Sequence, residues 1–213
     1  SSAASDVYKR QPQQFADKYI VNDLRNYVCL VNDPREANPY GKTYTVDRLG
    51  NVLGAAPVRY LNVPMPVMKD CAATVLQAGK PVWFGCDTEQ QADRDLSLWD
   101  KNLYDYGAVY GVDFGMDKEE RLLSHESLMT HAMLFVGVDM LDGAPRRWRV
   151  ENSWGCEDRA DEGFYTMNDS WFDEYVFEIA VHRDRLPAKY REVIDSEDAP
   201  VVLPAWDPMG SLA

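Results

Sequence analysis

The sequence has few of the residues that build metal sites and disulfide frameworks. Its 213 residues include 4 cysteines and 3 histidines, and no two cysteines form a CxxC pair. This spacing argues against a zinc knuckle or a thioredoxin-like site, so we expect no metal. Four cysteines in a chain of this length do not form a disulfide scaffold, and no secretory apolar segment opens the chain. A reducing, cytoplasmic environment is therefore predicted.

Long apolar runs and an excess of positive charge are also missing. No apolar run approaches the ~18 residues of a membrane helix, so a membrane protein is not expected. The chain has 22 Lys and Arg against 35 Asp and Glu, a formal net charge of −13. From Glu151 to Asp198, 5 basic residues stand against 14 acidic ones. Because this charge repels polyphosphate, nucleic acid is not an expected partner.

The composition that remains is that of a globular domain with mixed secondary structure. Hydrophobic residues make up 46% and aromatic residues 12% of the chain. Apolar patterns and turn residues predict helices at Pro66–Ala78 and Lys118–Ser124, and strands at Val28–Asn32, Pro81–Cys86, Ala132–Met140, Arg147–Asn152, Phe164–Met167 and Val176–His182. These elements do not alternate as βαβ units. They predict an α+β fold whose second half is a small antiparallel sheet or barrel.

The two ends differ in character from the chain between them. Ser1–Gln11 is polar and aperiodic, and its DVYKRQ resembles a translated sequencing adapter. We therefore expect a non-native tail over 1–11, a domain over 12–199, and a natural protein that continues upstream of Pro12. The last segment, 200–213, is apolar and has three prolines. We expect it to be an extended arm that packs along other parts of the protein and pairs poorly in a sheet.

One of the three histidines is a candidate catalytic residue. His125 and His182 have polar neighbours and are expected at the surface, whereas His131 begins an apolar strand. Asp142-Gly143 is a strong hairpin turn signal, so facing residues have numbers that sum to about 285. The residue numbers of His131 and Asn152 sum to 283. This places the two residues opposite each other within about one register step. An Asn can orient an imidazole, although a histidine there is more often a rim residue and an Asn a turn residue.

Five segments carry a family resemblance. VCLVNDPR (28–35), PVWFGCD (81–87), SLMTHAM (127–133), RWRVENSWG (147–155) and LPAWDPMGSLA (203–213) occur in order. Together they resemble the bleomycin hydrolase / aminopeptidase C family of papain-like cysteine peptidases. The resemblance covers nearly everything after the adapter-like segment. It implies the papain-like fold, a Cys-His-Asn site, no cofactor and a homohexamer when full length.

The resemblance assigns roles to four residues. His131 would be the general base, Asn152 its orienting partner, and Trp154 the indole that covers their hydrogen bond. The carboxylate of Ala213 would bind the N-terminal ammonium of a peptide, which would make the enzyme an aminopeptidase. The carboxylates Asp87 and Glu151 neighbour these motifs and are expected to lie at the surface or to bind neighbouring basic groups.

The nucleophile of the family is missing from this sequence. The family places it in a Gln…Cys-Trp segment before a long helix, and none of Cys29, Cys71, Cys86 and Cys156 is followed by Trp. The thiol and its oxyanion-hole Gln are therefore expected upstream of this chain. Two alternatives stay open: a catalytically inactive assembly or binding fragment, and a transglutaminase-like acyl transferase, which also uses a thiol and a histidine.

Overall fold

The computed structural model describes residues 11–20, 24–50, 54–55, 57–155, 162–196 and 198–210. Within these ranges, eleven strands form one sheet with the order β11-β2-β3-β1-β10-β4-β7-β8-β9-β6-β5. The strands are β1 (Tyr27–Val31), β2 (Thr43–Val46), β3 (Tyr60–Asn62), β4 (Val82–Cys86), β5 (Ala92–Asp93), β6 (Leu98–Trp99), β7 (His131–Leu141), β8 (Ala144–Glu151), β9 (Phe164–Asn168), β10 (Val176–His182) and β11 (Val201–Leu203).

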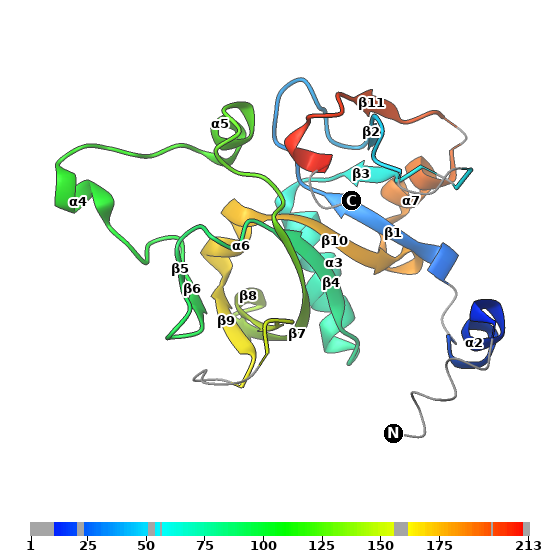
Figure 1. The fold of residues 1–213 in the computed structure, drawn as a ribbon, viewed down its shortest axis with the longest axis horizontal. Coiled ribbons are helices and arrows are strands. Elements are labelled where there is room, and N and C mark those ends of the chain that lie inside the picture. Colours follow the sequence, from blue (N-terminus) through cyan, green and yellow to red (C-terminus); the bar gives the residue numbers. More distant parts are fainter. Residues whose placement is uncertain are drawn as a thin grey trace.

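The helices are α2 (Pro12–Tyr19), α3 (Met65–Gln77), α4 (Tyr106–Tyr110), α5 (Lys118–Leu123), α6 (Asp169–Tyr175) and α7 (Ala188–Asp195), with 3-10 turns η1 (Leu24–Asn26), η2 (Arg183–Arg185) and η3 (Pro208–Gly210). Some helices pack against the sheet, whereas α2 and α4 lie on segments that extend away from it (Figure 1). No helix in the described ranges is long and apolar enough to cross a membrane. The α+β class is confirmed, and one sheet includes strands from both halves of the chain.

The local predictions agree closely with the structure. Helix α3 begins with Pro66 in its first turn and is followed by Gly79 at a φ of 75°. The hairpin β7–β8 turns at Asp142 and Gly143, whose φ values of 51° and 82° are those of a type I′ turn. Helices α6 and α7 were not predicted, because their few apolar residues give no long periodic pattern.

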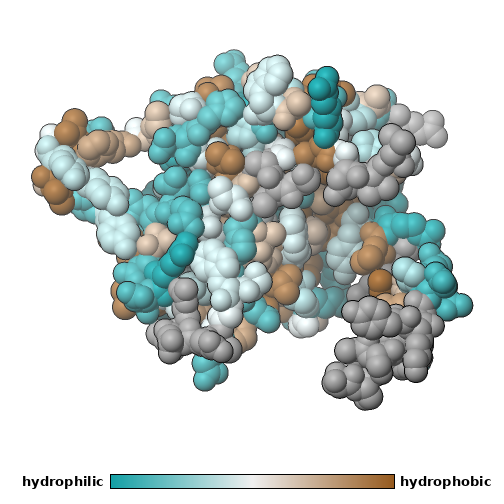
Figure 2. Space-filling model, in the orientation of Figure 1, coloured by the Kyte–Doolittle hydropathy of each residue, from teal (hydrophilic) through white to brown (hydrophobic). Residues whose placement is uncertain are grey.

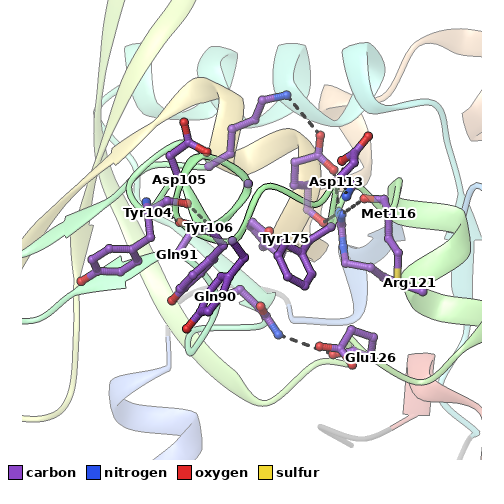
Figure 3. Close-up of a pocket in the computed structure, with 16 residues that line it drawn as sticks. Gln90, Gln91, Tyr104, Asp105, Tyr106, Asp113, Met116, Arg121, Glu126 and Tyr175 are labelled. Atoms are coloured by element: carbon purple, nitrogen blue, oxygen red, sulfur yellow. Dashed lines mark hydrogen bonds and ion pairs between the residues drawn. The ribbon is translucent and has the colours of Figure 1, made fainter.

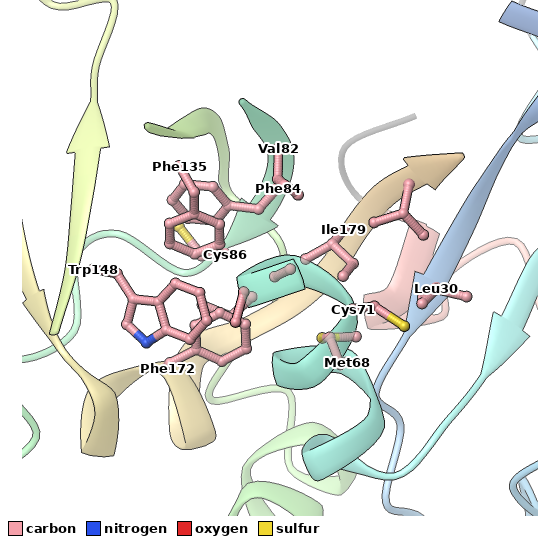
Figure 4. Packing of buried hydrophobic residues seen from close by; sticks show 14 of the residues in the cluster. Leu30, Met68, Cys71, Val82, Phe84, Cys86, Phe135, Trp148, Phe172 and Ile179 are labelled. Carbon is pink, nitrogen blue, oxygen red and sulfur yellow. The ribbon is translucent and has the colours of Figure 1, made fainter. Parts of the chain in front are cut away.

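Two buried clusters lie on opposite faces of the sheet. Neighbouring residues of a strand point to opposite faces, and Leu30 belongs to the first cluster while Val31 belongs to the second. In the first, helix α3 packs on β4, β7 and β10, and the rings of Phe84 and Phe135 stack with centroids 3.7 Å apart (Figure 4). Each fully buried ring of this kind stabilises the fold by about 1.5–3 kcal/mol.

The C-terminal segment belongs to the second cluster. Leu203 and Met209 are buried there together with Tyr44 and Val46 of β2. The prediction that this segment pairs poorly in a sheet is wrong, since β11 pairs in parallel with β2. The physical reason is that Pro200 and Pro204 flank β11 without entering it, which leaves its backbone amides free to donate. Residues 1–10 and 211–213 lie outside the described ranges.

The segment between β6 and α5 projects from the body. It carries α4 and extends at the left of Figure 1, and apolar side chains are visible along it in Figure 2. Val109, Tyr110 and Phe114 are 74%, 67% and 61% exposed. Exposure of this many large apolar side chains on one projection is typical of a surface that contacts another polypeptide.

Candidate functional site

The hairpin β7–β8 brings His131 and Asn152 together. The pairing Leu134 with Glu151 and Phe135 with Val150 follows the register predicted from the turn. His131 is the first residue of β7, and Asn152 directly follows β8, so both lie at the open end of the hairpin. His131 Nε2 and Asn152 Oδ1 are 3.0 Å apart. The predicted contact between these two side chains is therefore present.

A backbone amide fixes the chemistry of this contact. The N–H of Ser153 donates to Asn152 Oδ1 at 2.7 Å, which identifies that atom as the amide oxygen. The His131 ring nitrogen that faces the same oxygen must be a donor, because two acceptors would repel each other. The neutral ring therefore carries its proton on Nε2, and its Nδ1 is left as the acceptor that can take up a proton.

Asn152 itself is held in a closed environment. The residue is 9% exposed, and its Nδ2 is buried without a hydrogen-bond partner among the described residues. A buried amide that lacks one partner is costly, in the range of about 1–3 kcal/mol. The oxygen of this amide is thus used within the chain, while its nitrogen is enclosed without an acceptor among the described residues.

Trp154, which the resemblance assigns to cover the Asn152–His131 hydrogen bond, lies against the histidine ring. Its indole stacks on the His131 imidazole with centroids 4.9 Å apart and an interplanar angle of 27°. On the same indole lies the guanidinium of Arg94, whose Cζ is 4.6 Å from the ring centroid. Arg94 also pairs with Glu89 at 2.6 Å. Nothing in the polar sequence between β5 and β6 indicated that Arg94 would reach this site.

The loop before β7 is fixed by Asp87. The Ser127 hydroxyl donates to Asp87 Oδ2 at 2.9 Å, and Thr130 donates its backbone N–H to Cys86 O at 2.9 Å. Burial raises the pKa of Asp87, and the hydrogen bond from Ser127 opposes that rise. The expectation that Asp87 lies at the surface is wrong, since it is 4% exposed. Glu151, the other carboxylate named with Asp87 in the sequence analysis, is exposed.

The described cysteines are not activated thiols. Cys71 and Cys86 are buried, and Cys29 is half-buried. Burial raises the pKa of Cys71 to about 11 and also raises those of Cys29 and Cys86. A nucleophilic cysteine needs a lowered pKa and access to substrate. Cys156 lies outside the described residues.

The remaining predicted site residues are accounted for as follows. His125 is exposed, and His182 lies at the surface beside Asp184, 3.4 Å away. Ala213, the predicted ammonium-binding residue, lies outside the described residues. Within the described ranges, no group of three His, Cys, Asp or Glu side chains is arranged to hold a metal ion.

A cavity of about 760 Å³ lies beneath the projecting segment and is separate from His131. Figure 3 shows Tyr104, Tyr106 and Tyr175 around it. Its lining includes Arg121 and Lys101, which both pair with Glu174, at 2.5 and 3.5 Å. These two cations of the cavity are therefore already paired within the chain.

Comparison with known proteins places these features in a family. A profile of the peptidase C1-like family matches residues 5–210. Aminopeptidase C of Streptococcus thermophilus is 45% identical over 203 residues, and human bleomycin hydrolase is 47% identical over 208; each match covers 95% of this chain and 45% of the relative. This chain thus spans about 45% of the length of the curated relatives it matches.

A solved structure agrees with the fold. The crystal structure of PepW from Lactobacillus rhamnosis HN001 superposes with a TM-score of 0.92 at 45% sequence identity, over 96% of this chain and 46% of that one. Both sequence and fold therefore match over nearly the whole chain. This chain belongs to the peptidase C1-like family, with aminopeptidase C and bleomycin hydrolase among its relatives.

Proposed function

We propose that this chain supplies the histidine and asparagine of a cysteine-type aminopeptidase. The observation that carries the proposal is the His131–Asn152 pair at 3.0 Å, with the Trp154 indole stacked on the imidazole. A histidine oriented by an amide and covered by an indole is suited to exchange protons with a thiol. The relatives named aminopeptidase C support the exopeptidase assignment.

The first half of the proposed reaction forms a thioester. A cysteine thiol outside this chain transfers its proton to His131 Nδ1, and the thiolate attacks the peptide carbonyl carbon. The imidazolium then gives that proton to the leaving amine as the C–N bond breaks. Asn152 Oδ1 accepts the Nε2 hydrogen throughout, so the ring keeps its direction.

The second half hydrolyses the thioester. His131 Nδ1 takes a proton from water, the resulting hydroxide attacks the acyl carbon, and the thiol is released with the proton returned. The residues required are a thiol, an imidazole and an orienting amide. No metal or organic cofactor enters this scheme.

The proposed substrates are peptides with a free N-terminus. The carboxylate of Ala213 would pair with the substrate ammonium and so allow removal of one residue at a time. We propose a homohexameric, cytoplasmic enzyme when the chain is part of the full-length protein. The exposed apolar side chains of the projecting segment supply a surface for such subunit contacts.

On its own this chain is proposed to be inactive. The raised pKa values of Cys29, Cys71 and Cys86 support this, since none is poised to form a thiolate. The assembly or binding fragment therefore remains an alternative for the isolated chain. A transglutaminase-like acyl transferase is disfavoured by the family match, which is to peptidases.

The test needs the coding sequence upstream of this chain and the protein that it encodes. We expect a Gln…Cys-Trp segment there, and hydrolysis of aminoacyl-coumarin substrates by the longer protein. His131→Ala should abolish that hydrolysis, while His182→Ala, at the surface of β10, should leave it unchanged. Ser or Ala in place of the upstream Cys, or full activity of His131→Ala, would overturn the proposal.

A further inference from the structure

The cavity beneath the projecting segment is lined by aromatic rings and carboxylates (Figure 3). Its rings belong to Tyr104, Tyr106, Tyr110, Phe114 and Tyr175. Its volume of about 760 Å³ lies within the range of sites that enclose a small ligand or a ligand side chain, about 300–1,000 Å³. The cavity is therefore large enough to hold a long side chain together with part of its backbone.

The negative charge of this cavity is only partly balanced. Both of the cations that line it pair with the same carboxylate, Glu174. Asp105, Asp113 and Glu126 also line it, and among the described residues none of these three pairs with a cation. Asp105 and Asp113 each accept one backbone N–H at 2.8 Å, which orients the carboxylate but leaves its charge in place. An open cavity with such an excess of one charge attracts a ligand of the opposite charge.

One ring of the cavity already binds a guanidinium. The Cζ of Arg121 lies over the Tyr175 ring, 4.8 Å from its centroid, and the same guanidinium pairs with Glu174. A ring and a carboxylate thus bind this cation together, which is the geometry of a cation–π contact. The rest of the lining offers the same two kinds of group to a further cation.

Both ends of the segment over the cavity are anchored. The Gln91 side chain accepts from the Tyr104 backbone N–H at 2.9 Å and donates to the Tyr104 carbonyl oxygen at 3.4 Å. At the other end, Arg121 donates to the carbonyl oxygen of Met116. The cavity is therefore formed before a ligand arrives, which lowers the entropic cost of binding.

The cavity lies within reach of a peptide held at His131. Thr130 directly precedes His131, and its hydroxyl accepts the backbone N–H of Thr88 at 3.2 Å. Gln90, two residues after Thr88, lines the cavity. These steps put the Gln90 backbone within roughly 20 Å of His131, the length of about six extended residues. A peptide that is cleaved after its first residue has the rest of its chain free to cover this distance.

We propose that this cavity binds a basic side chain, Lys or Arg, that follows the cleaved bond of a peptide substrate by a few residues. The role in substrate choice rests on the proposed aminopeptidase function, whereas binding itself does not. The carboxylates attract the positive charge, and the rings contact the cation from the side. A neutral side chain of the same shape gains neither interaction, so the cavity selects by charge. The preferred substrates are thus peptides with a basic residue near the N-terminus.

The first experiment measures binding in this chain and needs no activity. The probes are acetyl-Gly-Arg-Gly-amide, its Lys analogue, and its citrulline analogue, whose urea group has the shape of a guanidinium without the charge. NMR titration at low salt gives the three Kd values. We expect the Arg and Lys probes to bind at least about fivefold more tightly than the citrulline probe. Equal Kd values, or the absence of saturable binding, would overturn the proposal.

Two variants assign that binding to the cavity. Tyr106 and Glu126 are exposed, so replacing them is compatible with folding, which the amide spectrum of each variant checks. Tyr106→Leu and Glu126→Gln should each weaken the Arg probe at least about threefold. Tyr106→Phe, which keeps the ring, and Glu192→Gln, at an exposed position of α7, should keep the wild-type Kd. Wild-type Kd values in folded Tyr106→Leu and Glu126→Gln would overturn the assignment.

The second experiment tests substrate choice in the longer protein that carries the thiol. Peptides with Arg or citrulline at one of positions two to seven are compared by kcat/KM for release of the first residue. We expect the Arg-to-citrulline ratio to reach at least about threefold at one or more positions, mainly through KM. Glu126→Gln should reduce this ratio to near unity, and Glu192→Gln should keep it.

The outcomes separate the two proposals. A ratio near unity at every position in the wild-type protein would overturn the role of the cavity in substrate choice. A wild-type protein that releases no first residue from any of these peptides would overturn the proposed aminopeptidase function, and the titrations in this chain would then decide whether the cavity binds basic side chains.

Discussion

His131 and Ser153 share one acceptor: Nε2 of the histidine and the backbone N–H of the serine both face Asn152 Oδ1, at 3.0 and 2.7 Å. The serine amide is a permanent donor, so it fixes the direction of the Asn152 side chain. That direction in turn fixes which nitrogen of the imidazole carries the proton. The proton-accepting atom of the site is thus set by a backbone group that takes no part in the proposed chemistry.

Replacement of Asn152 by Leu should remove this control. Leu has nearly the same shape but cannot accept a hydrogen bond, so the proton of neutral His131 should distribute over both ring nitrogens. Nitrogen-15 NMR of the ring in this chain would measure the change. In the longer protein, kcat should fall roughly 10- to 100-fold, the effect of losing one hydrogen bond to a group that becomes charged. Asn102→Leu, at an exposed position, is the control, and a single Nε2–H form in Asn152→Leu would contradict the assignment.

Replacement of Arg94 by Ala should loosen the indole over His131. A cation over an exposed aromatic ring contributes about 0.5–1 kcal/mol, so the expected effect is modest. Hydrogen exchange at the Trp154 indole N–H, assigned with Trp154→Phe, should accelerate roughly two- to fivefold. Arg146→Ala, which removes an equally exposed arginine paired with Asp139, should not change it. Equal exchange rates in both variants would show that Arg94 does not restrain Trp154.

Replacement of Glu178 by Gln should change the pH dependence of stability. Burial raises the pKa of Glu178 to about 7, and the Cys29 thiol that binds it opposes this rise. Between the unfolded value near 4.5 and 7, the folded protein binds more protons than the unfolded one, so stability is lost as pH rises through this window. The loss should approach about 3 kcal/mol by pH 8.

In Glu178→Gln the loss of stability between pH 5 and pH 8 should be absent. Urea unfolding at pH 5 and pH 8 would measure it as a change in the free energy of unfolding. Glu192→Gln, at an exposed position of α7, should keep the wild-type pH dependence. If the free energy of unfolding changes equally with pH in the wild type and in Glu178→Gln, Glu178 does not titrate in this range.

Replacement of Gly210 by Ala should strain the C-terminal segment. The added Cβ would approach Val46 Cγ1 to 2.9 Å, and Val46 is buried and cannot move freely. Overpacking of this kind costs about 1–3 kcal/mol, and each kcal/mol lowers Tm by about 2–4 °C in a domain of this size. Calorimetry would measure the lowered Tm of Gly210→Ala. Gly50→Ala, which meets nothing within 4 Å, should leave Tm unchanged, and a Gly210→Ala protein with wild-type Tm would mean that the segment yields without cost.

Local sequence determined the elements that lie next to the candidate site. Asp142 and Gly143 specify a type I′ turn because only such residues readily adopt positive φ at both positions. That turn fixes the register of β7 and β8, and the register brings His131 to Asn152. Alternating apolar residues such as Met133 and Phe135 specify which face is buried. Local sequence signals were therefore sufficient to predict the contact between His131 and Asn152.

Contacts between distant segments were decided only by the tertiary structure. The burial of Asp87, the stacking of Arg94 on Trp154, and the pairing of β11 with β2 join residues that no local pattern links. The Arg35–Asp207 pair spans 172 positions. Such contacts depend on how eleven strands are ordered in one sheet, and that order is set by the packing of both faces together. The sequence by itself thus determined the histidine–asparagine pair, whereas only the tertiary structure decided what covers it and how the C-terminal segment packs against β2.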